Sequence, residues 1–310
     1  MVHIFILFIF GFILLKKGAD MLVEGASSIA KRFKVGDAVI GLTVVALGTT
    51  MPEFTVGLTG AFSGQVDVSL GNVIGSTIAN SLFILGVAAL VSQLVVRKET
   101  ASQELPFFFF SVLAVLFLAN DAFLDGSAKS VITRADGLVL LVLFVAFLYY
   151  TLTSGRFAKQ DIKDVKVEQV KFFRPHIAIG MVVGGAAALF LGGRWVVDGA
   201  VEMARLFHIS EALIGLTLVA FGTSLPELFT AVTAARKNKA DIAIGNIIGA
   251  NILNLVWVLG FCAFVRGIDY STELNVDFLF SALERVSRKH RDCSCLYIWL
   301  FGKPFYIINT

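Results

Sequence analysis

The sequence predicts an all-α, polytopic membrane protein made of two inverted-topology repeats of five helices, in which the last two helices are missing or altered. Three observations lead to this prediction. The 310 residues are 57% hydrophobic and 16% charged, with a mean hydropathy of +0.83, whereas soluble domains carry about 25% charged residues. Several apolar runs approach or exceed the ~20 residues that a helix needs to cross a bilayer. A short motif also recurs 174 residues further along the chain.

This recurrence keeps a constant spacing. Residues 41–53 read GLTVVALGTTMPE and residues 215–227 read GLTLVAFGTSLPE, with nine of 13 positions identical. A second block, GNVIGSTIAN at 71–80, returns as GNIIGANILN at 245–254 with the same offset. Because no insertion separates the copies, we interpret them as an internal duplication.

Each predicted span has its own signal. The apolar run that begins the chain is followed by Lys16 and Lys17 and lacks a small-residue cleavage site, so it indicates a long tilted span rather than a signal peptide. The second and seventh spans contain the first motif, and the third and eighth contain the second block. A phenylalanine-rich run forms the fourth span. The expected spans are 4–30, 38–60, 68–91, 105–120, 132–152, 176–204, 211–234 and 241–265.

These spans divide the chain into four parts. We expect a first inverted repeat at 1–155 with spans one to five, a charged cytoplasmic linker at 156–174, a second inverted repeat at 175–280 with spans six to eight, and an atypical charged tail at 281–310. By the offset, the tail should repeat the fourth span. Six charged residues instead crowd 284–292, and such charges are costly within lipid. We therefore expect that residues 281–310 do not form two lipid-crossing helices.

Basic residues predict the orientation. Five spans in one repeat is an odd number, so the second copy enters the membrane inverted, an arrangement typical of secondary transporters. With the N-terminus outside, the inner loops hold fourteen Lys and Arg residues and the outer loops four. This positive-inside bias predicts a multi-pass protein of the cell membrane with a cytoplasmic linker. The net charge of +3 gives no argument for nucleic acid, and the three cysteines suggest neither a disulfide framework nor a metal site.

Two glutamates in apolar spans predict an ion-binding site. Glu53 and Glu227 each lie within an apolar span, where a carboxylate is costly and normally marks an ion or proton pathway. Related by the repeat, they would converge near the midplane and repel each other unless a cation lay between them. A divalent ion matches their joint charge, and Ca²⁺ takes about 6–8 hard oxygen ligands. The pair therefore predicts a Ca²⁺ site.

Neighbouring residues can supply further oxygens. Thr49 and Thr50 precede Glu53 by four and three residues, which places all three on one helix face. Thr223 and Ser224 repeat this arrangement before Glu227. The prolines at 52 and 226 should break the helix near Gly48 and Gly222 and free the carbonyls of residues 46–48 and 220–222. The second block adds Asn72, Ser76 and Asn80, repeated as Asn246, Ala250 and Asn254. For Asn72 and Asn246, ligand and packing roles stay open, and the glycines favour close helix packing.

At these residues the chain resembles the sodium/calcium exchanger (cation/Ca²⁺ antiporter) superfamily, especially its prokaryotic ten-span members. The resemblance covers about residues 4–265 and implies exchange of Ca²⁺ for Na⁺ or H⁺ by alternating access. It implies that Glu53 and Glu227 take Ca²⁺. The resemblance also shows two differences: Ala250 stands where a serine hydroxyl often supplies an Na⁺ ligand, and Asn254 stands where some members, including potassium-dependent ones, carry aspartate. The implied metal site comprises Glu53, Glu227, Thr49, Thr50, Ser76, Asn80, Thr223, Ser224, the carbonyls of Ala46 and Ala220, and Asn254.

Other functions stay open at this point. An H⁺/Ca²⁺ antiporter is the nearest alternative, since paired carboxylates can carry protons. A Ca²⁺ channel would use a similar carboxylate site, but channels form their filters as symmetric rings. We expect no enzymatic activity, because neither a nucleophile–base pair nor a histidine cluster is evident. We expect no cofactor beyond the transported Ca²⁺ and Na⁺, and no partner beyond these ions and the bilayer; neither nucleic acid nor an obligate protein partner is indicated.

Overall fold

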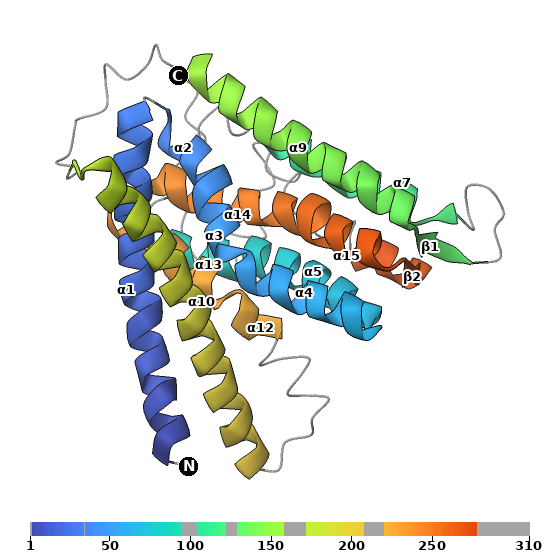
Figure 1. The fold of residues 1–310 in the computed structure, drawn as a ribbon, viewed down its shortest axis with the longest axis horizontal. Helices are drawn as coiled ribbons and strands as arrows, with labels where there is room; N and C mark the ends of the chain where they lie inside the picture. Colours follow the sequence, from blue (N-terminus) through green and yellow to red (C-terminus); the bar gives the residue numbers. More distant parts are fainter. Residues whose placement is uncertain are drawn as a thin grey trace.

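The computed structural model describes residues 2–33, 35–92, 94, 104–121, 129–157, 172–207 and 220–277. In this part the chain is helical apart from one short β-ribbon (Figure 1). The first copy contains α1 (Val2–Phe33), α2 (Asp37–Ile40), η1 (Gly41–Val45), α3 (Ala46–Thr49), α4 (Met51–Ser63), α5 (Val66–Ala79), η2 (Asn80–Ile84), α6 (Leu85–Val91), α7 (Leu105–Leu118), β1 (Ser130–Ile132) and α9 (Arg134–Phe157). The second contains α10 (Pro175–Leu206), α12 (Ala220–Thr223), α13 (Leu225–Arg236), α14 (Ala240–Leu253), η5 (Asn254–Val258), α15 (Leu259–Val265), β2 (Ile268–Tyr270) and the short 3₁₀ turn η6 (Thr272–Leu274).

The duplication read from the sequence is present in the structure. The helix α5, the π-helical turn η2 and the helix α6 recur as α14, η5 and α15, each displaced by 174 residues at both ends. The pair α3 and α4 recurs as α12 and α13. Even the π-helical turn η2 is copied, as η5, and such turns occur frequently at functional sites. The protein is thus an all-α polytopic membrane protein with two repeats.

Helix length and hydropathy support the second, third, fifth, sixth and eighth predicted spans, and α1 covers the predicted first span. Four described helices are long and apolar enough to cross a membrane: 66–91, 134–153, 175–206 and 240–265. A fifth span is the bent pair 37–49 and 51–63. The predicted fourth span corresponds to the shorter apolar helix α7, and the seventh is described only from residue 220.

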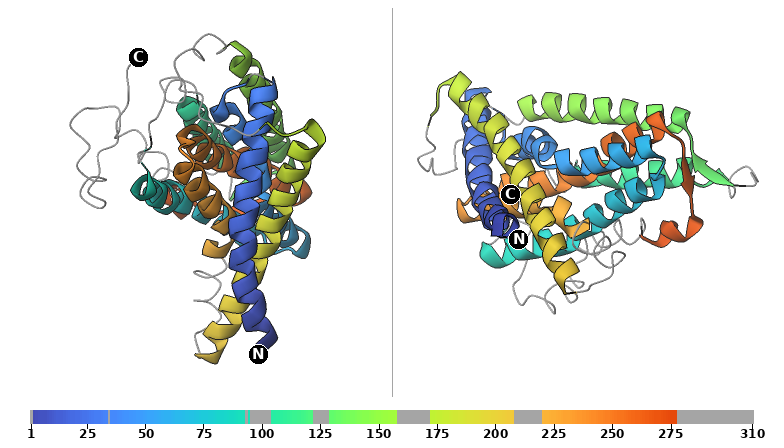
Figure 2. Two further views of the ribbon diagram at one scale, coloured as in Figure 1. Left: turned by 90° about the vertical axis from the view of Figure 1, so that its left-hand side faces the viewer. Right: turned by 60° about the horizontal axis from the view of Figure 1, so that its bottom comes forward.

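The first helix of each copy packs against its counterpart. The helices α1 and α10 lie side by side along their length and are steeply inclined to α4, α5, α14 and α15 (Figures 1 and 2). A Cβ atom on Gly18 would lie 2.8 Å from the carbonyl oxygen of Gly185, and one on Gly11 would lie 2.8 Å from that of Gly192. The repeat relates Gly11 to Gly185 and Gly18 to Gly192. Glycine at these positions therefore allows the close approach that membrane helices achieve with small residues.

Burial identifies the centre of the molecule. In the span 240–265 the protein buries 83% of the most apolar window, against 22% in the span 134–153. The second span of each copy surrounds α14, whereas α7 and α9 lie at the periphery with many exposed apolar side chains. Trp257 of η5 stacks on Phe54 of α4 with ring centroids 4.5 Å apart, and on Phe144 of α9 at 5.9 Å. These rings hold the second copy against the first.

The β-ribbon joins the two copies at one face of the molecule. Strand β1 pairs antiparallel with β2, with Ser130 opposite Tyr270. The amides of Asn120 and Asn275 exchange two hydrogen bonds of 2.9 and 2.8 Å, and the Tyr270 hydroxyl donates to Asn275 at 2.8 Å. The segments before α9 and after α15 thus lie on the same face, as the predicted alternation of spans requires. Most of the 156–174 linker and the tail 281–310 lie outside the described residues.

Candidate cation-binding site

Each copy interrupts its second span just before the glutamate. Thr50 has φ −76° and ψ 1°, and Ser224 has φ −87° and ψ 4°, so both leave the helical conformation. In the first copy the flanking helices bend by 48°. Glu53 and Glu227 then lie in the first turn of α4 and α13. A helix N-terminus carries partial positive charge, which favours a carboxylate at this position.

The break differs in place from the sequence prediction. Helix α3 continues to Thr49, one residue beyond the predicted break at Gly48, and α12 continues to Thr223, one residue beyond the predicted break at Gly222. The Ala46 carbonyl accepts a 2.9 Å hydrogen bond from the Thr50 N–H and lies 3.2 Å from the Thr49 hydroxyl, whose single hydrogen it shares with the Asn246 oxygen at 3.0 Å. The expectation that residues 46–48 and 220–222 are unwound is therefore wrong, because Pro52 and Pro226 are accommodated in the first turn of the next helices, where no N–H is needed.

Hydroxyl groups from both copies surround Glu53. Its side chain is completely buried, and its Oε1 accepts hydrogen bonds from Ser76 at 3.4 Å and from Ser224 at 3.3 Å. Its Oε2 has no hydrogen-bond partner among the described residues. Ser224 belongs to the second copy, so the duplicated motifs meet as the sequence predicted.

Glu227 is also completely buried, in a less satisfied environment. It lies close enough to Glu53 for their charges to interact and near the hydroxyls of Thr49 and Thr50. Neither of its oxygens has a hydrogen-bond partner within the part of the chain that is described, and the same holds for the Thr50 hydroxyl. The copies differ here because Ala250 stands where the first copy has Ser76 and cannot donate to the glutamate.

Two asparagines, Asn72 and Asn246, connect the copies through hydrogen bonds. Thr49 donates to the Asn246 oxygen at 3.0 Å, and Thr223 donates to the Asn72 oxygen at 3.3 Å. These bonds are related by the repeat. A threonine whose hydrogen is held in this way keeps its oxygen lone pairs available for a cation. In this structure Asn72 and Asn246 therefore orient the two threonines.

The last pair of predicted ligands lies one turn beyond. Asn80 and Asn254 are both completely buried at the start of η2 and η5. The Asn80 amide nitrogen donates to Asn251 at 3.0 Å, and its oxygen has no partner in the described structure. Neither amide atom of Asn254 has a hydrogen-bond partner among these residues.

This arrangement suits a hard cation. None of the hydrogen bonds or ion pairs found for the two glutamates involves a cationic side chain. In the described ranges no three His, Cys, Asp or Glu side chains cluster as a metal site, so the other oxygens would come from hydroxyls, amides and carbonyls. Buried carboxylates without a counter-charge are strongly unfavourable. Oxygen ligands of this kind bind Ca²⁺ and other hard cations.

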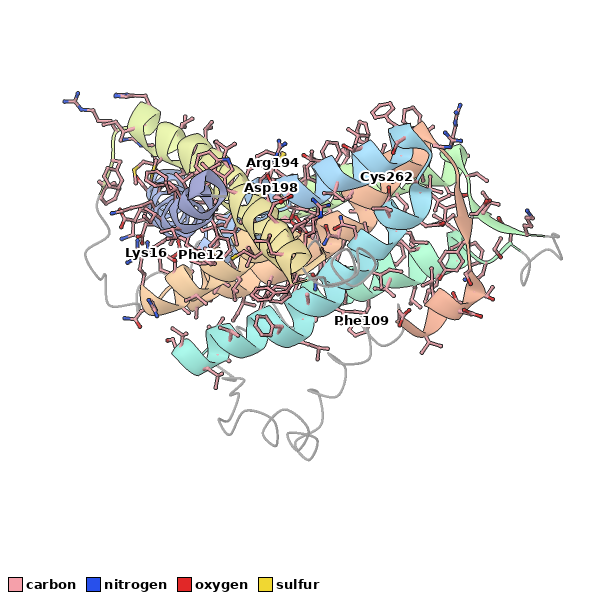
Figure 3. All side chains as sticks on the ribbon, turned by 90° about the horizontal axis from the view of Figure 1, so that it is seen from below. Phe12, Lys16, Phe109, Arg194, Asp198 and Cys262 are labelled. Atoms are coloured by element: carbon pink, nitrogen blue, oxygen red, sulfur yellow. The ribbon has the colours of Figure 1, made fainter. Side chains whose placement is uncertain are left out.

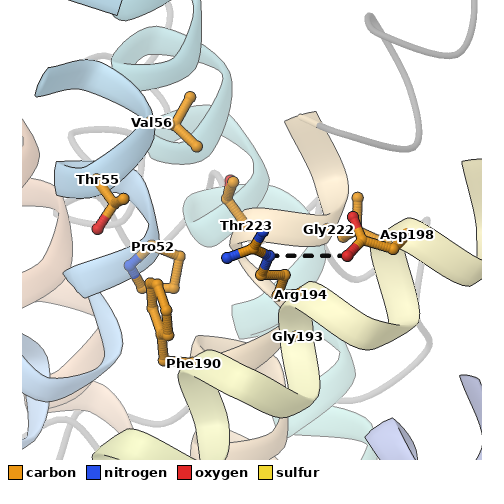
Figure 4. Close-up of a pocket in the computed structure, with 10 residues that line it drawn as sticks. Pro52, Thr55, Val56, Phe190, Gly193, Arg194, Asp198, Gly222 and Thr223 are labelled. Carbon is orange, nitrogen blue, oxygen red and sulfur yellow. Dashed lines mark ion pairs between the residues drawn. The ribbon is translucent and has the colours of Figure 1, made fainter. Parts of the chain in front are cut away.

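A cavity reaches the site from one side. Its volume is about 230 Å³, and it lies between α4 and α10, with Pro52 and Val56 on one wall and Gly193 on the other (Figure 4). Thr223, at its inner end, belongs to the candidate site. Arg194 and Asp198 also line it and form a mostly exposed pair 3.7 Å apart on α10 (Figures 3 and 4).

The corresponding place in the other copy is closed. There α1 packs directly on α13. Lys237, just beyond α13, contacts Asp20 at 2.7 Å and Glu24 at 2.8 Å. Burial lowers the pKa of Lys237, but its hydrogen bonds to the two carboxylates and their charges outweigh this effect, so its pKa is raised above 10.5. The amine therefore remains charged throughout the physiological pH range.

Some residues at or near the site were missed by the sequence reasoning. Asn251 orients Asn80, and Thr230, one turn after Glu227, is a buried hydroxyl without a partner in the described structure. Asn251 stands inside the second repeated block, where the first copy has Thr77, and this difference between the copies could have pointed to it. The ion pairs of Lys237 join residues more than 200 positions apart, so no local pattern reveals them.

Comparison with known proteins agrees with this geometry. A family profile described as "Sodium/calcium exchanger protein" matches residues 3–153 and 177–286. Among similar proteins, the Inner membrane protein YrbG of Escherichia coli is 38% identical over 291 residues, covering 89% of this chain and 87% of YrbG. The Sodium/calcium exchanger MaX1 of Methanosarcina acetivorans is 32% identical over 284 residues, covering 83% and 81% of the two chains.

The solved structures show the same fold. One structure of the sodium-calcium exchanger NCX_Mj, soaked with 10 mM Na⁺ and no Ca²⁺, superposes with a TM-score of 0.77 at 30% identity, covering 96% of this chain and 91% of that one. The repeats, the buried glutamates and these comparisons agree: the chain belongs to the sodium/calcium exchanger family.

Proposed function

We propose that this protein is a secondary active antiporter that exchanges Ca²⁺ for Na⁺ across the cell membrane by alternating access. One observation carries the proposal: Glu53 and Glu227, one from each repeat, are completely buried near each other without a cationic partner among the described residues. Two carboxylates match the charge of one Ca²⁺ or of two Na⁺ ions. Either cargo would neutralise the pair, which is the basis of an exchange at a shared site.

The neutral oxygens support Na⁺ as the coupling ion. A site that carries only protons needs carboxylates, whereas Na⁺ needs several uncharged oxygens around it. We propose that the ligands are Glu53, Glu227, Thr49, Thr50, Ser76, Asn80, Thr223, Ser224, Asn254 and the Ala220 carbonyl, with the Ala46 carbonyl contributing less because of its two hydrogen bonds. We also propose that no K⁺ is required, because residue 254 is Asn rather than Asp.

The uneven packing supports alternating access. In the predicted orientation, with the N-terminus outside and residues 156–174 in the cytoplasm, the cavity between α4 and α10 lies in the outer half of the membrane. The contact of α1 with α13, with its ion pairs to Lys237, lies in the inner half. This corresponds to an outward-facing state. Its inward-facing counterpart would exchange the two arrangements, since the repeats are equivalent by inversion.

Uptake of ⁴⁵Ca²⁺ into proteoliposomes tests this proposal. Vesicles loaded with Na⁺ and diluted into Na⁺-free buffer should accumulate Ca²⁺, and added K⁺ should not change the rate. Vesicles with only an imposed pH gradient should accumulate little. Equal uptake under a pH gradient without Na⁺ would instead support an H⁺/Ca²⁺ antiporter, and uptake without any counter-ion gradient would support a channel.

A further inference from the structure

The most informative difference between the copies lies beside the glutamates, at Asn251. This residue is completely buried in α14. Its oxygen accepts a 3.0 Å hydrogen bond from the Asn80 amide nitrogen, and its own amide nitrogen donates to the Ser81 hydroxyl at 2.9 Å. Asn251 therefore uses both ends of its amide to join the two copies.

These bonds determine which end of Asn80 faces the site. The side chain of Asn80 lies one helical turn after Ser76, which donates to Glu53. An amide has an oxygen that can bind a cation and an NH₂ group that repels one. Because Asn251 holds the NH₂ group, the Asn80 oxygen is left buried and without a hydrogen-bond partner in the described structure.

The second copy lacks this arrangement. The counterpart of Asn251 is Thr77, whose hydroxyl donates to the Val73 carbonyl of its own helix at 2.8 Å. The counterpart of Asn80 is Asn254, for which neither amide atom has a partner among the described residues. The two asparagines are thus chemically equal but differently constrained, and only Asn80 has a fixed orientation.

We propose that Asn251 is a positioning residue that fixes the Asn80 carboxamide with its oxygen toward the bound cation. The proposal rests on the proposed function, because it assumes that Glu53, Glu227 and Asn80 share a cation. It makes the site asymmetric: Asn80 is a pre-oriented ligand, whereas Asn254 must orient when the ion arrives. The benefit is affinity, because a pre-oriented ligand loses less entropy on binding.

Equilibrium binding of ⁴⁵Ca²⁺ to the purified full-length protein in detergent tests the role. The variant Asn251→Leu keeps the number and branching of the side-chain heavy atoms but cannot accept the bond from Asn80, and Asn251→Thr introduces the residue of the first copy. Each should raise the Kd for Ca²⁺ about 3- to 10-fold, the effect of one hydrogen bond. Thr77→Ala is the matched control and should leave the Kd unchanged, because that hydroxyl bonds only its own helix.

The same measurement in the Asn80→Asp variant distinguishes a positioning role of Asn251 from a merely structural one. In Asn80→Asp the two carboxylate oxygens are equivalent, so orientation no longer matters. Adding Asn251→Leu to Asn80→Asp should then change the Kd by less than about twofold, the usual limit for uncoupled sites. An equal loss in both backgrounds, or an unchanged Kd in both Asn251 variants, would overturn the proposal.

A failure of the Asn251 proposal can be distinguished from a failure of the proposed exchange function. If the wild-type protein binds Ca²⁺ but Na⁺-loaded vesicles in Na⁺-free buffer do not take it up, the exchange proposal fails. The Asn251 variants then still test whether Asn251 positions Asn80. If the wild-type protein binds no Ca²⁺, both proposals fail.

Discussion

Replacement of Lys237 by Gln should open the inner half of the protein. In the structure this amine contacts Asp20 and Glu24 of α1 and so holds α1 against the end of α13. Lys239 adds a 2.6 Å hydrogen bond to Ser27 of the same helix. Without the Lys237 charge, two neighbouring carboxylates lose their shared counter-ion. The state in which α1 separates from α13 should then become more populated.

The exposure of these groups sets the size of the effect. The side chain of Lys237 is 26% exposed and those of Asp20 and Glu24 are 37% exposed, so the cluster is neither fully buried nor at the open surface. Exposed pairs contribute about 0–1 kcal/mol, and removal of one partner of a buried pair costs about 3–5 kcal/mol. We expect about 1–2 kcal/mol, which corresponds to a shift of roughly 5- to 30-fold in the ratio of the two states.

Accessibility of a cysteine at Val23 measures this shift. Val23 is completely buried in α1, and the repeat relates it to Val197, which lines the open cavity. In a background with Cys262, Cys293 and Cys295 changed to alanine, Lys237→Gln should speed labelling of Val23→Cys by an impermeant reagent from the cytoplasmic side by that factor. The control Arg205→Gln removes the same charge from an exposed pair with Glu202 and should have no effect. An unchanged labelling rate in a correctly inserted Lys237→Gln protein would refute the reasoning.

Two further predictions follow from the structure, and a third follows from the distribution of basic residues in the sequence. Ala250→Ser restores the hydroxyl that Glu53 has and Glu227 lacks, so the Na⁺ concentration for half-maximal Ca²⁺ exchange should fall by about 2- to 10-fold; a rise or no change would show that residue 250 does not face the ions. Gly18→Leu should greatly reduce the yield of folded protein and lower its Tm, because a Cβ atom already lies 2.8 Å from the Gly185 oxygen, whereas Gly180→Leu, with no atom within 4 Å of the added Cβ, should be tolerated; equal stability would contradict the proposed close packing. Single cysteines near Lys163 and Lys237 should react only from the cytoplasm and one near Asp125 only from outside, and labelling of the 163 site on intact cells would reverse the orientation.

Much of the fold could be predicted from the sequence because membrane helices depend on long apolar runs and because the duplication doubles every signal. The constant 174-residue offset predicts that Glu53 and Glu227 are equivalent positions, and the structure brings both to one buried region. Membrane helices must satisfy their backbone internally, so the apolar runs correspond closely to the observed helices.

The finer features of the site depend on contacts between distant segments. A proline marks a helix break only to within a turn, and here Pro52 is the second residue of the next helix and does not unwind the residues before it. The roles of Asn72 and Asn246 could not be decided, because a buried amide serves equally as a ligand or as a hydrogen-bond partner until its neighbours are known. The threonines that they contact, Thr223 and Thr49, lie in the opposite copies.

The central claim, that two glutamates from the two repeats form one cation site, is tested most directly by Na⁺-driven ⁴⁵Ca²⁺ uptake into proteoliposomes containing Glu53→Gln or Glu227→Gln. Each change preserves side-chain volume and removes half of the charge that matches a divalent ion. We predict that each variant inserts into the membrane at wild-type levels and that its uptake falls to that of protein-free vesicles. Near-normal uptake by either variant would contradict the two-glutamate site.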